Sequence, residues 1–222
     1  MPVPRIKICC IQRPAEAREA VLAGANALGL VSAMPSGPGV IDEATARGIA
    51  AQVPPPVATF LLTSAQRPAA IIAQQQRIGA TAVQLCDAID PSDDKALRRA
   101  LPRTHLVQVI HVQGPAARAE AAAAAPHVDA LLLDSGNPQA AVKELGGTGR
   151  VHDWAISRTI RDAVDVPVFL AGGLHAGNVA AAIAQVRPFG VDVCSGVRTN
   201  GMLDAEKVRA FVAAVQDTRS DA

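Results

Sequence analysis

The sequence predicts an α/β fold, a single-domain (β/α)8 barrel that spans residues 1–222. Short runs of β-branched residues alternate strictly with Ala-rich stretches of helical length that contain scattered charged residues. This alternation indicates a parallel sheet with helical crossovers. Eight such units of about 28 residues each come close to the lower size limit of a TIM barrel. A doubly wound open sheet is the rival fold, but no Gly-rich turn follows the first strand.

Strands are expected where β-branched and aliphatic residues cluster, and helices where Ala and spaced charges follow them. The expected strands are 6–11, 27–31, 57–62, 82–85, 106–110, 130–133, 166–170 and 191–194. The expected helices are 15–23, 42–52, 69–78, 92–100, 116–125, 154–163, 178–186 and 204–216.

The composition excludes several classes of function. Half of the residues are hydrophobic, and 21 Lys and Arg against 20 Asp and Glu give a net charge of +1. The chain therefore lacks the excess of positive charge that is typical of a protein that binds nucleic acid or a membrane surface. No run has the length of a signal peptide or of a spanning helix. Four scattered cysteines without a CxxC element form neither a disulfide framework nor a zinc ribbon, so a reduced cytoplasmic enzyme is expected.

Period-two parity predicts which side chains enter the barrel, because adjacent strand residues point to opposite faces. In the first strand Lys7 and Cys9 are expected to face the axis, and Cys10 to pack against the helices with the isoleucines. The polar set then converges at the carboxyl ends of the strands, where barrel enzymes hold their sites. The other members of this set are Gln84, Cys86, Asp134, Asp192 and Cys194.

Two Gly-centred segments near the C-terminus predict a phosphate site. Gly172 and Gly173 follow the seventh strand, and Ser195 and Gly196 follow the eighth. Glycine lets backbone amides approach an anion closely, and these two loops commonly hold phosphate in barrels. The alternative is that these glycines only make tight turns. Gly147, in the Gly-Gly-Thr-Gly segment after the sixth strand, is part of a mobile lid or a further anion contact, and the alternative is a flexible connector.

Cys9 and Asp134 are the best acid–base pair in the sequence. A thiol is a base only as the thiolate, so it needs a nearby cation, and Lys7 is one pleat away on the same face. The alternatives are a buried cysteine that packs as a small hydrophobe and a carboxylate that serves a turn.

These segments resemble the phosphoribosylanthranilate isomerase family in order and spacing over nearly the whole chain. The matching segments are KICC, VQL, LLLDS, GGTG with a following DW, LAGGL, NV and GVDVCSGV. The family is a cofactor-free (β/α)8 barrel that converts N-(5-phosphoribosyl)anthranilate into 1-(2-carboxyphenylamino)-1-deoxyribulose 5-phosphate for tryptophan. The resemblance implies a phosphorylated sugar as substrate.

By this resemblance Cys9 is the base and Asp134 the acid of an Amadori rearrangement, without metal or cofactor. The residues expected to bind substrate or phosphate are Lys7, Gln84, Gly147, Gly172, Gly173, Ser195, Gly196 and Arg198. A monomer or homodimer is expected, with neither nucleic acid nor membrane as a partner.

The chain departs from the family at the amine end of the substrate. Where the family has Gly after its catalytic Cys, this chain has Cys10, and Cys86 and Asp87 replace a His–Gly pair. The loop after the second strand usually carries an Arg for the anthranilate carboxylate, and Gly39 ends the corresponding Ser-Gly-Pro-Gly stretch here. A bidentate Arg–carboxylate pair is not replaced by glycine without loss, so Arg198, or else Arg13, is expected to supply the cation.

Three other interpretations remain open on the sequence. One is a paralogue that isomerises a different phosphorylated aminosugar, and another is a non-catalytic barrel that binds phosphosugars. The third is a zinc site made by Cys9, Cys86 and Cys194, which is disfavoured because their strands are not adjacent around the barrel.

Overall fold

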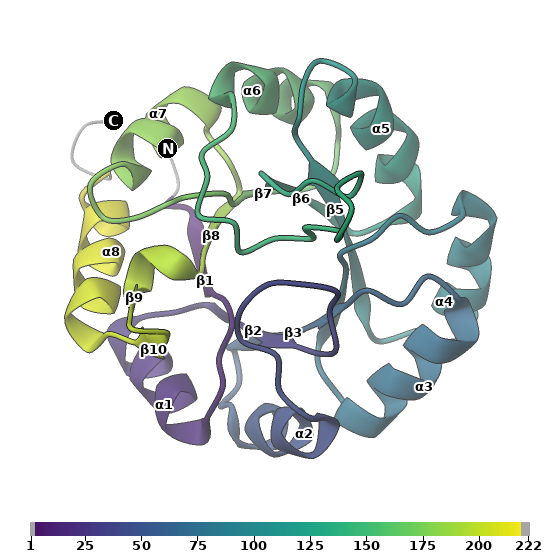
Figure 1. Cartoon of the computed structure of the whole chain (residues 1–222), viewed down its shortest axis with the longest axis horizontal. Helices are drawn as coiled ribbons and strands as arrows, with labels where there is room; N and C mark the ends of the chain where they lie inside the picture. The colour runs from purple at the N-terminus through teal and green to yellow at the C-terminus, as the bar shows by residue number, and fades with distance from the viewer. Residues whose placement is uncertain (1–2, 219–222) are drawn as a thin grey trace.

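Eight parallel strands close into a barrel in the computed structural model, which describes residues 3–218. Each strand pairs with its neighbour in the sequence, and β1 pairs with β8 through Ile8 and Val193 to close the ring. Figure 1 looks down the barrel, with the helices forming an outer ring around the strands. The predicted (β/α)8 fold is confirmed; residues 1–2 and 219–222 of the predicted domain lie outside the described part.

The elements match the predicted ones to within a few residues at each end. The barrel strands are β1 Arg5–Ile8, β2 Ala27–Val31, β3 Ala58–Thr63, β4 Ala82–Leu85, β5 His105–His111, β6 Ala130–Asp134, β7 Val168–Leu170 and β8 Gly190–Val193. The α-helices are α1 Pro14–Ala23, α2 Glu43–Gln52, α3 Pro68–Ile78, α4 Asp94–Ala100, α5 Ala117–Ala124, α6 Trp154–Ala163, α7 Val179–Val186 and α8 Ala205–Asp217.

Short elements that the sequence pattern does not predict complete the chain. They are the 3-10 turns η1 Pro91–Asp93, η2 Ala125–His127 and η3 Ser195–Val197, and a hairpin of β9 Arg198–Thr199 with β10 Met202–Leu203. Two-residue strands are too short to show any periodicity.

Several helix ends follow from local sequence. Pro14 begins α1, where its missing amide hydrogen costs no hydrogen bond. Asp42 and Asp204 cap α2 and α8 through their carboxylates. Gly24 and Gly79 end α1 and α3 in the left-handed conformation that glycine adopts without strain. No helix among the described residues is both long and apolar enough to span a bilayer.

The interior of the barrel has its own small core, separate from the larger one between strands and helices. Phe60 and Phe169 meet edge to face there, with ring centroids 5.9 Å apart. The Lys7 ammonium lies 5.3 Å from the Phe60 ring centroid and forms an ion pair with Asp192 at 2.9 Å. This buried pair lies just below the carboxyl ends of the strands and makes that end of the barrel polar.

Candidate active site

A cavity opens at the carboxyl ends of the strands, where the sequence predicts the site. Its walls come from β2, β3, β4, β6 and β8 and from the segments after β1, β2, β4, β6, β7 and β8. Of the predicted residues it contains Cys9, Gln84, Asp134, Gly147, Gly172, Gly173 and Ser195. Lys7, Gly196 and Arg198 lie outside its lining.

Cys9, directly after β1, and Asp134, at the end of β6, reach this cavity from separate parts of the ring. The Cys9 sulfur is nearly buried over Gly29, where a Cβ atom would come within 2.7 Å of it. The Asp134 carboxyl accepts a hydrogen bond from the Ser135 amide at 2.7 Å. Burial, helped by the nearby Asp192 carboxylate, raises the pKa of Asp134 above its usual value. Asp134 is therefore suited to hold a proton that it can donate.

Lys7 is fully buried on the face of β1 that the parity argument predicts. Burial alone would lower its pKa, but the Asp192 carboxylate and the Cys9 thiol outweigh burial and raise it. Lys7 therefore carries its positive charge beneath the cavity. It does not touch the space that a substrate would fill, so its influence on Cys9 is electrostatic.

The loops after β7 and β8 present backbone to the cavity. Gly172 and Gly173 both have positive φ, at +82° and +62°, and a Cβ on Gly173 would lie 2.7 Å from the Arg150 carbonyl carbon. A Cβ on Gly196 would lie 2.0 Å from the Leu174 oxygen, so Gly196 brings the two loops together rather than lining the cavity. Within residues 3–218, the amides of Gly172, Gly173 and Ser195 have no hydrogen-bond acceptor. Such amides form a site for an anion.

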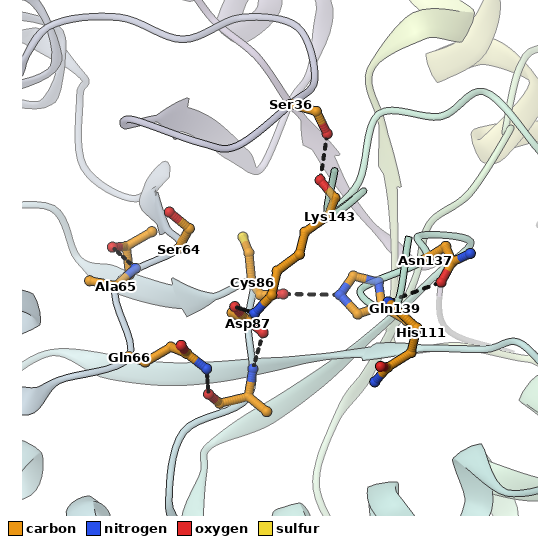
Figure 2. A network of polar contacts seen from close by, with 12 residues as sticks. Ser36, Ser64, Ala65, Gln66, Cys86, Asp87, His111, Asn137, Gln139 and Lys143 are labelled. Carbon is orange, nitrogen blue, oxygen red and sulfur yellow. Dashed lines mark hydrogen bonds and ion pairs between the residues drawn. The ribbon is translucent and has the colours of Figure 1, made fainter. Parts of the chain in front are cut away.

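The loop after β6, residues 135–153, covers the cavity together with the loop after β2. Figure 1 shows both loops crossing the barrel mouth. The Ser36 hydroxyl donates to the Lys143 carbonyl at 2.7 Å, and the Lys143 ammonium reaches Asp87 at 2.5 Å, as Figure 2 shows. Thr148 contacts the Ser135 hydroxyl at 2.8 Å, and Gly147 packs against Pro38. The Gly-Gly-Thr-Gly segment is thus held over the site at several points.

Buried polar atoms without a partner mark further positions around the site. The Oε1 atom of Gln84, a cavity residue, is buried without a hydrogen bond. His152, beside Gly172, keeps an unpartnered Nδ1, and burial lowers the pKa of its ring to about 4. The His111 ring contacts the Cys86 carbonyl at 3.0 Å (Figure 2). Gln84 therefore brings an unpaired hydrogen-bond acceptor to the lining of the cavity.

The structure does not bring Arg198 or Arg13 to the cavity. The Arg198 guanidinium is buried behind β1, where it donates to the Cys10 carbonyl, to Gly201 and to Glu16. Arg13 is exposed and pairs with the same Glu16 carboxylate at 3.6 Å. Both cations are engaged by partners that the sequence pattern does not reveal, so the expected replacement for the family arginine is not found in either.

The predicted orientation of Cys10 is wrong. The strand ends at Ile8 rather than at residue 11, and Cys10 has a φ of +62°, so alternation no longer holds there. Its side chain lines the cavity, with its sulfur 2.7 Å from that of Cys194. Gly39 leaves room for it, since a Cβ on Gly39 would lie 2.4 Å from the Cys10 Cβ. The glycine that the family usually has at the position of Cys10 could have predicted this orientation, because glycine is typical of a left-handed backbone.

The cavity is poor in positive charge. Among the described residues, no Lys, Arg or His side chain lines it, whereas the carboxyl groups of Asp134 and Asp192 do. Likewise, within that part of the chain no three His, Cys, Asp or Glu side chains are grouped to hold a metal ion. The anion-binding capacity of the cavity therefore lies in its backbone amides.

Comparisons with known proteins agree with the geometry. The model of the N-(5'phosphoribosyl)anthranilate (PRA) isomerase family matches residues 6–214. The N-(5'-phosphoribosyl)anthranilate isomerase of Haloarcula marismortui is 37% identical over 210 residues, 94% of each chain. That of Methanocella arvoryzae is 36% identical over 217 residues, 97% of this chain and 99% of the other.

Solved structures give the same result. Phosphoribosyl anthranilate isomerase from Thermus thermophilus superposes with a TM-score of 0.81 at 28% identity, covering 96% of this chain and 98% of that one. The enzyme from Thermotoga maritima also scores 0.81, at 29% identity, covering 96% and 99%. These matches confirm the predicted resemblance and the isomerase class. The chain belongs to the N-(5'-phosphoribosyl)anthranilate isomerase family.

Proposed function

We propose that this chain catalyses the Amadori rearrangement of N-(5-phosphoribosyl)anthranilate in tryptophan biosynthesis, with Cys9 as base and Asp134 as acid. The observation that supports it most is one cavity lined by a thiol, a carboxyl group of raised pKa and the glycine loops after β7 and β8. A related structure, with a TM-score of 0.79 at 27% identity, is described as a complex with reduced 1-(o-carboxyphenylamino)-1-deoxyribulose 5-phosphate.

The proposed steps need only groups of this chain. Asp134 donates its proton to the ribose ring oxygen, which opens the ring to a protonated Schiff base. Cys9, as the base, removes the proton from C2 to give the enolamine. Cys9 then returns its proton to C1, and the C2 hydroxyl gives up its proton, which restores the Asp134 carboxyl group directly or through water and leaves the aminoketose with no net change of protons or electrons. Gln84 accepts a hydrogen bond from a sugar hydroxyl in this arrangement.

The phosphate is proposed to bind the free amides of the loops after β7 and β8. Gly173→Ala should raise KM about ten- to a hundredfold, because the new Cβ forces the loop away from Arg150 and misplaces a charge-assisted hydrogen bond. Gly79→Ala is the matched control: φ is +74° there, and nothing lies within 4 Å of the added atom. Steady-state kinetics of both variants test this, and an equal KM in the two would remove the phosphate from this loop.

The amine end of the cavity favours a second candidate substrate. An anthranilate carboxylate would enter a partly closed site with two Asp carboxyl groups and, among the described residues, no cationic side chain. Burying a carboxylate without a partner is costly. This observation favours a related N-(5-phosphoribosyl)amine that lacks the carboxylate, acted on by the same acid, base and phosphate loops.

Complementation of a tryptophan auxotroph that lacks this isomerase distinguishes the candidates. Growth supports the anthranilate substrate. Failure of the folded protein, with turnover of N-(5-phosphoribosyl)aniline in vitro, supports the carboxylate-free substrate. Binding of either compound without turnover would contradict both and leave a phosphosugar-binding barrel.

We further propose a cytoplasmic monomer or homodimer whose partner is the small phosphorylated sugar. The near-neutral net charge of +1 supports the expectation that neither nucleic acid nor a membrane surface is a partner. A homodimer is supported by a Thermotoga maritima relative that is described as a dimeric enzyme from which monomers were generated.

A further inference from the structure

Two thiols in the cavity have no part in the proposed reaction. The sulfur atoms of Cys10 and Cys194 lie 2.7 Å apart. They follow β1 and β8, which are neighbours in the sheet, with Ile8 opposite Val193. Cys10 is nearly buried and Cys194 is partly exposed, so one sulfur of the pair is open to a small reagent.

Cys10 is held in this position by its surroundings. Its left-handed backbone turns the side chain into the cavity, and Gly39 leaves the space that the side chain needs. Its carbonyl oxygen accepts from the buried Arg198 guanidinium, which Glu16 anchors at 3.3 Å. The backbone conformation of Cys10 and its neighbours therefore place its sulfur beside that of Cys194.

We propose that Cys10 and Cys194 are a modification site, a dithiol that low-molecular-weight disulfides oxidise reversibly to an intramolecular disulfide. The sulfurs need to approach by only about 0.7 Å to reach the length of a disulfide bond. The cross-link ties the ends of β1 and β8 together between Cys9 and the Ser195 loop. Loss of isomerisation on oxidation follows from this placement, and that consequence rests on the proposed function.

The two thiols differ in a way that assigns their roles. The hydrogen bond with Cys10, and then the Arg198 charge, lower the pKa of Cys194. The hydrogen bonds with Cys194 and Cys9, together with burial, raise the pKa of Cys10. Cys194 is thus the attacking thiolate, and Cys10 is the thiol that resolves the intermediate.

The exchange balances without any further reagent. The Cys194 thiolate attacks one sulfur of the disulfide RSSR, forms a Cys194–SR mixed disulfide and expels RS⁻. Cys10 gives its proton to that RS⁻ and attacks the Cys194 sulfur, which releases a second RS⁻. The two cysteines are oxidised, and RSSR is reduced to two thiols once the second RS⁻ takes the proton released by Cys194 on ionising.

Incubation of the reduced full-length chain with oxidised glutathione, followed by mass spectrometry, tests the site. The wild type should lose two hydrogen atoms, show a Cys10–Cys194 link in its peptide map, and recover with dithiothreitol. Cys10→Gly, which suits the φ of +62°, should keep glutathione on Cys194 as a stable mixed disulfide. Cys86→Ser, which changes the fully buried thiol, should form the link as the wild type does.

Three outcomes overturn the proposal: no intramolecular link in the wild type, a link from Cys9 instead, or a link between Cys194 and another cysteine in Cys10→Gly. Because mass reports the link without any substrate, these outcomes do not depend on whether the reduced protein isomerises. If it does, the linked form should lose at least about tenfold in turnover and dithiothreitol should restore it, since the bridge lies beside Cys9. Full activity of the linked form contradicts only the functional consequence.

Discussion

Cys9→Ala is expected to lower kcat/KM by about 10²- to 10⁴-fold, because it removes the base that takes the C2 proton. Its sulfur lies over Gly29 on the barrel face, so the substitution empties a small niche without moving a strand. The fold should therefore survive, with a far-ultraviolet spectrum and a cooperative thermal transition like those of the wild type. Steady-state kinetics on the phosphoribosyl substrate give the activity.

Cys86→Ala is the matched control, since Cys86 lines the same cavity directly after β4. Burial raises the pKa of Cys86, which keeps it a neutral thiol and unsuited to remove a proton. Its replacement should cost far less than that of Cys9. Near-wild-type turnover of Cys9→Ala would contradict the assignment of Cys9 as the base, whatever the turnover of Cys86→Ala.

Asp134→Asn is expected to be nearly as damaging, because an amide cannot donate the proton that opens the ribose ring. In the wild type, activity should fall at high pH as Asp134 loses its proton, and its raised pKa moves that fall above the usual range of a carboxyl group. The residual activity of the variant should lack this alkaline limb. A pH–rate profile of each protein provides the measurement.

The same variant should lose activity without losing stability. The folded state raises the pKa of Asp134 above the unfolded value of 3.8, so its contribution to stability is lost as pH rises through the folded pKa. At neutral pH Asp134→Asn should therefore melt no lower than the wild type. Asp192→Asn, by contrast, leaves Lys7 buried without its partner and should melt lower.

The role of Asp134 as the acid would be contradicted by wild-type turnover of Asp134→Asn with an unchanged pH–rate profile. Asp134 would then be a turn residue instead.

The fold and the meeting of Cys9 and Asp134 in one cavity were predictable because both depend on local periodicity. Alternation of eight units identified the barrel, and strand parity placed Lys7 and Cys9 inside it. Parity failed at Cys10 because a single residue with positive φ ends the alternation, and residue types alone do not reveal that angle. Arg198 was misplaced because its partner Glu16 is 182 residues away in sequence, beyond any local pattern.

The contact between Gly39 and Cys10 restricts the order in which substitutions can accumulate. A Cβ at position 39 would lie 2.4 Å from the Cys10 Cβ, so the two positions share the volume of one side chain. An arginine at position 39 would therefore need Cys10 to become glycine and the loop after β2 to shift, because the added Cβ also lies 2.9 Å from the Cα atom of residue 10 and the φ of +82° strains any side chain there. A lineage that acquires a cation at this position thus gives up the Cys10 thiol, and the two traits are mutually exclusive among its descendants.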